Sequence, residues 1–396
     1  MKAFLTHSYA RRAFDFLYYY SAGETPYLVR YSVRLVANEK THTIGLKTEQ
    51  LSLQAKGADW LKPGVISINN PYANADSLLW DVQLETSFDK SVENSTISAN
   101  ADRLALYSSQ QGLSFFFNDT FIGEYTKQED GSFSRTFGEM VRAFRVFGRH
   151  YFQVVRVNQF GMVNVSSLLP LLVHISAEEK MTSGVMTLMT DQENTILDEH
   201  FTLLQKSIEA INIALKGMIP DLSLEIEKKE EILKDNKIFY RVAIYSVRNG
   251  KRFSIRHESD GIKRLVSLLV YLISAYSSEE VCLVIDEFDD GVFEYLLGEI
   301  IATMGREARG QLIFTSHNLR IMEKLPTKNI ICTTTNPMNR YIRLHGYGPT
   351  NNIRDFYIRA LRLGGQEEEL YNMADIEDIG RALCEANMVI NAGTEK

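Results

Sequence analysis

The segment Glu280–Gly291, with the sequence EVCLVIDEFDDG, decides the fold. Its apolar run Val281–Ile285 has the length and composition of a buried β-strand. Four carboxylates follow within five positions, at Asp286, Glu287, Asp289 and Asp290. Like charges this close repel one another and are costly to desolvate unless a cation or a proton compensates them. The segment therefore predicts a buried strand that ends in a cation-binding group, although an acidic loop after a buried strand has the same local sequence.

The elements around this strand predict an α/β fold. A buried helix is expected from Gly261 to Tyr276. A membrane span is not expected there, because the apolar run is much shorter than the roughly 20 residues that cross a bilayer. A second helix is expected at 293–304 and a second strand at 310–318. Strand, helix and strand in this order predict parallel strands joined by a crossover helix. The acids then lie at the carboxyl end of the sheet, where open α/β sheets bind ligands.

The composition narrows the class of protein. The chain has 396 residues, of which 45% are hydrophobic and 23% are charged, as in an ordinary folded protein. Its net charge of −7 argues against wholesale wrapping of nucleic acid, although a local basic stripe stays open. The three cysteines are too few and too far apart for a disulfide framework or a zinc site, which favours a cytoplasmic location. Arg11, Arg12 and Asp15 interrupt the N-terminal apolar segment, so neither a signal peptide nor membrane association is expected.

Two further motifs lie at the ends of predicted elements. Ser259, Asp260 and Gly261 stand at the start of the first helix, where unpaired backbone N–H groups attract a phosphate and glycine allows its close approach. Ser259 as a plain N-cap explains the same residue. His317 lies in the polar cluster that ends the second strand, and a lone histidine there is more often structural than catalytic. At the acidic strand, an Asp suits Mg²⁺ held largely by water and phosphate, and an adjacent Glu suits activation of water.

Three segments carry a resemblance to a known family: SDGIKR beginning at Ser259, LVIDEFDDG beginning at Leu283 and FTSHN beginning at Phe314. They resemble the signature, the Walker B strand and the switch histidine of the ABC-type ATPase heads of the OLD and SMC-like group in the AAA family. The C-terminal NNIRDFYIRALRLGGQEEELY also looks like the tail of stand-alone bacterial members. The resemblance implies a P-loop NTPase-like mixed sheet flanked by helices, with an inserted, mainly helical arm or lid.

The resemblance also implies a role for five residues. Asp286 would bind Mg²⁺, Glu287 would polarise the attacking water, and His317 would sense the γ-phosphate. Ser259 and Gly261 would touch the ATP of a partner subunit, so that two copies form a homodimer around ATP and Mg²⁺. Hydrolysis would then open the dimer and control a partner. A nuclease or toxin effector and DNA are the candidate partners, and anti-phage defence is the role that the family implies.

The same resemblance divides the chain into three parts. Residues 1–70 would form the N-terminal part of the ATPase head, and residues 71–235 the inserted arm or lid. Residues 236–396 would form the C-terminal lobe, with the signature, the Walker B strand and the switch histidine.

Local patterns give further expectations. Apolar spacing predicts a helix over residues 1–20 and a mostly helical stretch over 176–215, whereas alternation predicts strands over 27–53. Asn249-Gly250 predicts a hairpin between two later strands. Arginines alternate with aromatic residues over 135–157, which favours an amphipathic helix with a basic face over a base-stacking surface.

One motif of the family is missing. No G-x-x-x-x-G-K-[ST] occurs, so the sequence offers no cradle of backbone N–H groups for the phosphates. The opening MKAFL fits a start just past the lysine of such a loop, and we therefore expect the chain to lack its natural N-terminus and to bind ATP poorly by itself. A nucleotide-free, catalytically degenerate scaffold or interaction subunit of the same fold is the alternative. A two-metal nuclease site ranks third, because no second acidic motif accompanies the first.

Phe288 and Phe293 stand where relatives often carry Pro and His or Asp.

Overall fold

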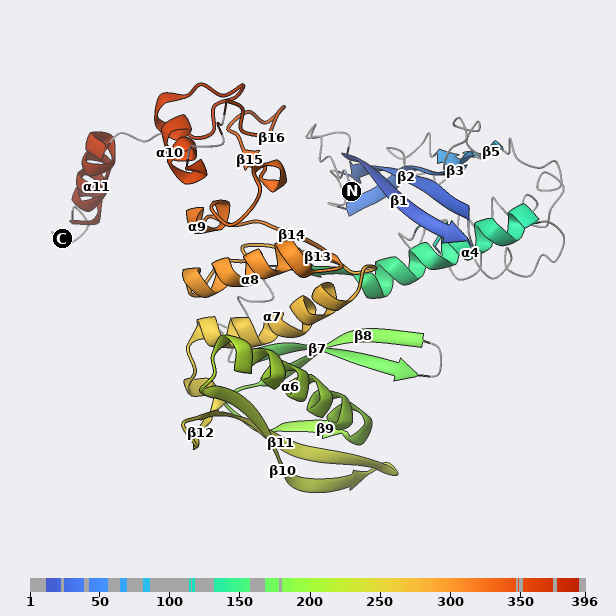
Figure 1. The fold of residues 1–396 in the computed structure, drawn as a ribbon, viewed down its shortest axis with the longest axis vertical. Coiled ribbons are helices and arrows are strands. Elements are labelled where there is room, and N and C mark those ends of the chain that lie inside the picture. The colour runs from blue at the N-terminus through green and yellow to red at the C-terminus, as the bar shows by residue number, and fades with distance from the viewer. Residues whose placement is uncertain are drawn as a thin grey trace. The chain divides into compact units, whose positions relative to one another are not determined.

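The structure is a computed structural model (Figure 1). It describes residues 12–22, 25–38, 43–55, 65–69, 81–85, 114, 116–117, 132–156, 168–177, 180–346, 348, 352–372 and 376–391. Backbone contacts divide the chain into two compact units, residues 1–148 and 149–396, and each is described by itself. The predicted class is confirmed, because the described residues form a mixed α/β structure with a parallel sheet and helices.

The first unit contains a five-stranded antiparallel sheet, followed by helix α4 (Ser132–Val146). In order across the sheet, its strands are β1 (Arg12–Ala22), β2 (Thr25–Asn38), β3 (Thr43–Ala55), β4 (Val65–Asn69) and β5 (Asp81–Glu85). The strands predicted over 27–53 are confirmed. The helix predicted over 1–20 is wrong for residues 12–20, which pair with β2 as β1. Phe14 and Tyr18 fit a helical spacing, but with Phe16 they also fit the two-residue period of a strand. Residues 1–11 lie outside the described residues.

The second unit is organised around a three-stranded parallel sheet in the order β14–β13–β6. These strands are β13 (Cys282–Ile285), β14 (Gln311–Phe314) and β6 (Phe152–Val155). The parallel pairing predicted between the acidic strand and the next one is confirmed. Strand β6 was not predicted. It lies in the stretch expected to be one amphipathic helix, which instead ends in a π-helical turn, η1 (Phe147–Tyr151). Four residues are too few to show a period, and pairing with β13 decides their conformation.

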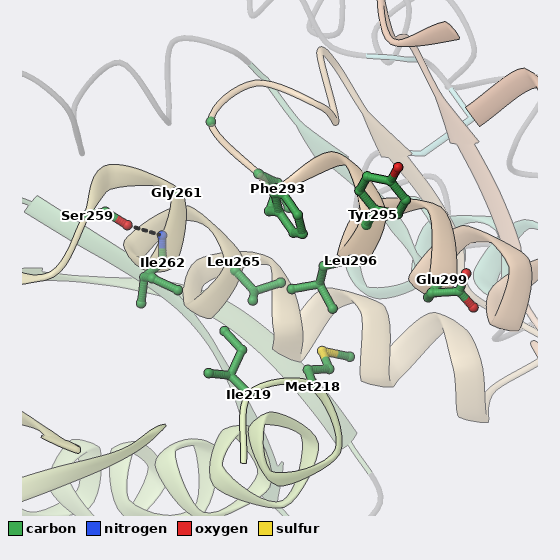
Figure 2. Close-up of a pocket in the computed structure, with 12 residues that line it drawn as sticks. Met218, Ile219, Ser259, Gly261, Ile262, Leu265, Phe293, Tyr295, Leu296 and Glu299 are labelled. Carbon is green, nitrogen blue, oxygen red and sulfur yellow. Dashed lines mark hydrogen bonds between the residues drawn. The ribbon is translucent and has the colours of Figure 1, made fainter. Parts of the chain in front are cut away.

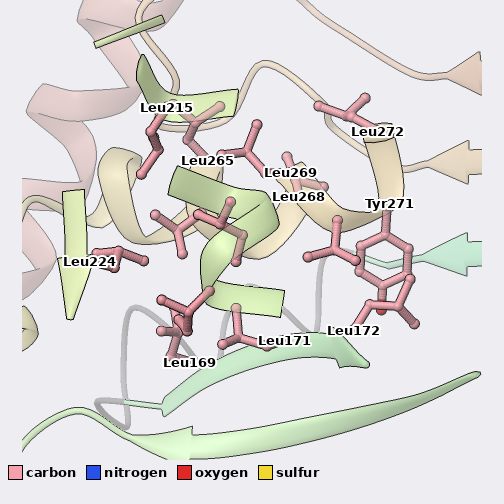
Figure 3. Close-up of a cluster of buried hydrophobic side chains, with 14 of the residues drawn as sticks. Leu169, Leu171, Leu172, Leu215, Leu224, Leu265, Leu268, Leu269, Tyr271 and Leu272 are labelled. Carbon is pink, nitrogen blue, oxygen red and sulfur yellow. The ribbon is translucent and has the colours of Figure 1, made fainter. Parts of the chain in front are cut away.

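Helix α7 (Asp260–Ser277) forms the centre of the main core. It packs on β13 and also on α6 (Asp198–Met218) and β7 (Leu168–Ala177) (Figure 1). Every residue from Lys263 to Leu272 is buried, as expected for a helix that is apolar nearly all round. Leucines of α7, α6 and β7 gather in one cluster (Figure 3). Full burial of each contributes about 1.5–3 kcal/mol, so the start of α7 is firmly placed.

A second, antiparallel sheet contributes residues to this core. Its strands are β10 (Leu222–Lys234), β11 (Lys237–Arg248), β12 (Lys251–Ser254) and β9 (Asn194–Leu197), with β9 and β12 both paired to β11. The hairpin predicted at Asn249-Gly250 is confirmed, with φ of 49° and 74° as in a type I′ turn. Asp235 and Asn236, between β10 and β11, have φ of 48° and 59° and make a second turn of this kind, which the sequence analysis did not identify.

The described residues of 71–235 are mixed rather than mainly helical. Besides α4 and α6 they include β5 to β10, among them β8 (Lys180–Met189), which pairs with β7. Within 176–215, the helix prediction is wrong before Asp198 and confirmed from there on. Pairing with β7 overrode the three-residue spacing of the methionines in β8. The three-part division at 70 and 235 stays a prediction.

After β13, the described residues continue with α8 (Glu294–Glu307) and β14, followed by further elements. They are α9 (Leu319–Met322), η3 (Thr327–Asn329), β15 (Cys332–Thr333), β16 (Tyr341–Ile342), α10 (Ile353–Leu363) and α11 (Ile376–Asn391). The three cysteines are free thiols. Burial raises the pKa of the Cys282 thiol and raises the pKa of Cys332 to about 11, whereas Cys384 is exposed. Among the helices in the described residues, none has the length and apolar character to cross a membrane.

Candidate functional site

One threonine of the neighbouring strand holds both acids at the end of β13. The Thr315 hydroxyl donates to Asp286 Oδ1 at 2.6 Å and accepts the backbone N–H of Glu287 at 2.8 Å. The Thr315 backbone extends the sheet pairing, because its N–H donates to the Ile285 carbonyl at 3.0 Å and its carbonyl accepts the Phe288 N–H at 2.9 Å. Thr315 therefore contacts both acids through its side chain and pairs through its backbone with the residues on either side of them.

Glu287 has a left-handed backbone, with φ of 48°. This conformation costs a residue with a Cβ roughly 1–2 kcal/mol. Arg264 of α7 opposes the cost: its guanidinium donates to the Glu287 carbonyl, and its Nη1 lies 2.7 Å from Asp290 Oδ2. The Arg264 side chain is only 3% exposed. Burial lowers the pKa of Arg264, and the carboxylates of Asp290, Asp289 and Glu287 oppose that shift. A buried cation of the same chain thus compensates part of the acidic cluster.

His317 lies beside the acids. Its backbone N–H donates to both carboxylate oxygens of Asp289, at 3.3 and 3.2 Å, and the residue is exposed. The next residue, Asn318, is the N-cap of α9 and accepts the N–H of Arg320 at 2.8 Å. The Asp289 carboxylate and the N-cap residue Asn318 together hold the turn that contains His317. His317 therefore lies at the same end of the sheet as Asp286 and Glu287.

Ser259 is the N-cap of α7. Its Oγ accepts the backbone N–H of Ile262 at 3.3 Å, and the residue is exposed (Figure 2). The preceding Glu258 accepts two hydrogen bonds from the guanidinium of Arg248, at 2.9 and 2.8 Å. These bonds hold the pKa of Glu258 below its usual value. The capping interpretation is confirmed, and contact between Ser259 and a nucleotide stays a prediction.

Gly261 packs against the loop that follows the acids. A Cβ atom at this position would lie 1.9 Å from the carbonyl oxygen of Gly291 and 3.1 Å from its carbonyl carbon. Gly291 itself has a φ of 70°, in the region that favours glycine. Close packing within the chain is therefore sufficient reason for a glycine at position 261. The same contact ties the start of α7 to the acidic loop.

A groove of about 450 Å³ opens beside the start of α7 (Figure 2). Its walls are mostly apolar and come from the end of α6, from α7, from the loop after the acids and from α8. Phe293 and Tyr295 line it with 69% and 55% of their surface exposed, and their ring centroids are 5.7 Å apart. Ser259 and Gly261 line this groove, whereas Asp286 is not among its lining residues.

The two phenylalanines that depart from the family pattern have different surroundings. Phe288 is 1% exposed and packs edge-on against Phe314, with ring centroids 5.4 Å apart. It belongs to the core under the acids. Phe293 precedes α8 without a capping side chain and is mostly exposed. Phe288 is therefore part of the core, whereas Phe293 lies on the surface and lines the groove.

The donor groups at Asp286 suit a magnesium ion that takes its other ligands from water and phosphate. The residue is exposed, and its Oδ1 is held by Thr315 while Oδ2 makes no hydrogen bond within the described residues. No group of three or more His, Cys, Asp and Glu side chains in the described part of the chain is arranged to hold a metal. One carboxylate with several waters is a normal Mg²⁺ arrangement.

The structure brings three of the five predicted residues, Asp286, Glu287 and His317, to one sheet edge and places Ser259 and Gly261 at a separate groove. Sequence reasoning missed Thr315 and Arg264. Both lie within motifs that had been singled out, Thr315 in FTSHN and Arg264 in SDGIKR. The available signals were the polar Thr315 at the end of a strand and the basic Arg264 inside an apolar helix.

Comparisons with known proteins include one family match over the segment that builds the candidate site. No curated protein is found to match the chain. Among solved structures, the chain is similar to the Smc head domain from Pyrococcus furiosus, with an extended coiled coil and bound to the C-terminal domain of ScpA. The identity is 10% and the TM-score 0.25, over 76% of this chain and 73% of that chain. Residues 187–323, about a third of the chain, match a family described as "AAA domain, putative AbiEii toxin, Type IV TA system". The segment that builds the candidate site is thus similar to an AAA-type ATPase domain.

Proposed function

We propose that this chain is an ABC-type ATPase subunit that dimerises around ATP and Mg²⁺. The observation that carries the proposal is the meeting of Asp286, Glu287 and His317 at the carboxyl edge of a parallel sheet, which is where such folds bind ligands. The match of residues 187–323 to an AAA domain supports the same class of activity.

Each side chain has a defined task in this proposal. ATP supplies a γ-phosphoryl group that can pass to water. Asp286 offers Oδ2 to Mg²⁺, because Thr315 already holds its other oxygen. Glu287 orients the attacking water and accepts its proton. His317 hydrogen-bonds the γ-phosphate and so distinguishes ATP from ADP.

The proposal uses two copies, because Ser259 and Gly261 line a groove whose walls do not include Asp286, Glu287 or His317. In the proposed dimer, the Ser259 hydroxyl and the free N–H groups at the start of α7 in one copy meet the triphosphate that the acids of the other copy hold. The exposed Phe293 and Tyr295 are covered by the same contact. Each site is then incomplete in a single chain.

Hydrolysis would separate the two copies and thereby change the surface offered to a partner. We take the partner to be a nuclease or toxin effector or a nucleic acid, and the role to be anti-phage defence. The description of the matching family names a toxin of a type IV toxin–antitoxin system, which supports a defence-related role. These assignments rest on similarity, since one fold serves many functions.

A scaffold subunit that binds no nucleotide is the second candidate. The missing G-x-x-x-x-G-K-[ST] favours it, because the 396 residues contain no recognisable cradle for the phosphates. The Asp286, Glu287 and His317 cluster would then be a remnant held in place by Thr315 and Arg264.

Titration calorimetry with ATP and Mg²⁺ separates the two candidates. It should use the natural full-length protein, with any residues encoded in frame before Met1. An ATPase is expected to bind ATP at micromolar concentrations, and Asp286→Ala should reduce the affinity in Mg²⁺ to the level seen with EDTA. Asp191→Ala, at an exposed acid remote from the site, is the matched control. Absence of nucleotide binding by the wild type would leave the scaffold as the function.

A further inference from the structure

We propose that Thr315 is a positioning residue, whose hydroxyl sets the orientation of Asp286 and of Glu287 together. The inference rests on the proposed function for the reaction that the two acids serve, whereas the geometry itself does not depend on that reaction. Thr315 lies two positions before His317 in FTSHN, and the family resemblance gives it no role.

The direction of the hydrogen bonds follows from the chemistry of a hydroxyl group. It has one proton to donate and two lone pairs to accept with. The proton goes to Asp286 Oδ1 at 2.6 Å, and a lone pair takes the backbone N–H of Glu287 at 2.8 Å. The bonds run in series from Glu287 N–H through Thr315 Oγ1 to Asp286 Oδ1, and hydrogen bonds in series polarise and strengthen one another.

For Asp286, this series restrains the carboxylate. With Oδ1 held, rotation about the Cβ–Cγ bond is limited and Oδ2 is the oxygen left for a cation. Residues that orient a metal ligand typically change the affinity for the metal about 10- to 100-fold when they are removed. We therefore expect the hydroxyl of Thr315 to affect metal affinity through Asp286, without itself being a metal ligand.

For Glu287, the same hydroxyl holds one side of a strained residue. Its N–H donates to the Thr315 hydroxyl, and its carbonyl accepts from Arg264 and from the Asp290 N–H. These bonds support a φ of 48°, which a residue with a Cβ otherwise disfavours. Without the hydroxyl, the Glu287 N–H loses its partner while the bonds to the Glu287 carbonyl remain, so we expect the backbone that carries the Glu287 carboxylate to be less restrained.

The side chain of Thr315 can be tested apart from the sheet. Its backbone bonds to Ile285 and Phe288 form in any residue, so they persist when the hydroxyl is removed. Thr315 is also exposed, so valine can replace it without a cavity. Thr315→Val deletes the hydroxyl at constant shape, and Thr315→Ser restores it. Thr195→Val, at an exposed threonine of β9, is the matched control.

Hydrogen exchange at the Glu287 amide is the first readout, and it needs no ligand. In Thr315→Val this amide should exchange about tenfold faster, as expected when one hydrogen bond of ordinary strength is lost. It should stay at the wild-type rate in Thr315→Ser and in Thr195→Val. Unchanged exchange in Thr315→Val would overturn the proposal, as would equal acceleration in the serine variant, which would assign the effect to packing of the methyl group.

Binding of Mn²⁺, followed by electron paramagnetic resonance with a non-hydrolysable ATP analogue present, is the second readout. On the natural full-length protein, Thr315→Val should weaken Mn²⁺ binding about 10- to 100-fold, with recovery in Thr315→Ser. Equal Mn²⁺ affinity in the valine variant and the wild type would remove Asp286 from the proposal. If the wild type binds no Mn²⁺, the proposed function fails, and the exchange data still decide whether the hydroxyl holds the loop.

Discussion

Glu287→Gln should lower ATP turnover by the natural full-length protein about 10²- to 10⁴-fold, the usual contribution of a general base. Glutamine keeps the size of the side chain and leaves the backbone bonds of residue 287 to Thr315 and Arg264 in place. It cannot accept the proton of the attacking water. The effect should therefore appear in the rate and not in ATP affinity, and phosphate release at saturating ATP measures it.

Glu199→Gln provides the control for this experiment. Glu199 lies in the first turn of α6, is exposed and is remote from the acids. Its turnover should equal that of the wild type. Equal turnover in Glu287→Gln and the wild type would remove Glu287 from the mechanism, and a parallel loss of ATP affinity would show that the substitution had disturbed the site as a whole.

Gly261→Ala is expected to destabilise the protein by about 1–3 kcal/mol, as overpacking typically does. The added methyl group would meet the Gly291 carbonyl oxygen at 1.9 Å, and both partners are backbone, so either the start of α7 or the acidic loop must move. Alanine in a helix otherwise gains about 0.5–1 kcal/mol over glycine. The clash should outweigh this gain. Urea unfolding followed by circular dichroism measures the change.

Gly298→Ala is the matched control for Gly261→Ala. Gly298 is also a helical glycine, in α8, but a Cβ there would meet only flexible side chains, Lys324 at 3.6 Å and Arg320 at 3.9 Å. This variant should be as stable as the wild type or more stable. If Gly261→Ala behaved in the same way, the contact between α7 and the acidic loop would not be as tight as described.

The acidic strand and the helix before it were predictable because each is a continuous segment with one dominant pattern. Cys282–Ile285 is short, apolar and followed by acids, and α7 is apolar over several turns. The sequence predicts that Gly261 allows a phosphate to approach, whereas in the structure it allows the backbone of Gly291 to approach. A glycine that admits a ligand and a glycine that admits another backbone look the same in a sequence.

The missed features depend on pairs of residues far apart in the chain. Arg264 reaches Glu287 and Asp290, and Thr315 reaches Asp286, across turns that no local pattern describes. Strand β6 forms through its parallel pairing with β13. Its four residues are too few to show the two-residue period of a strand. For the same reason β1 was mistaken for a helix, since pairing with β2 decides between two spacings that its aromatic residues both satisfy.

Nucleotide-dependent dimerisation of Glu287→Gln is the most direct measurement of the central claim, because this variant should bind ATP and hydrolyse it slowly. Light scattering on the natural full-length protein would give its mass with ATP and Mg²⁺, with ATP and EDTA, and without nucleotide. If two copies close around a metal-bound triphosphate, the mass should double with ATP and Mg²⁺ and stay unchanged in the other two conditions. One unchanging mass in all three conditions would contradict the account.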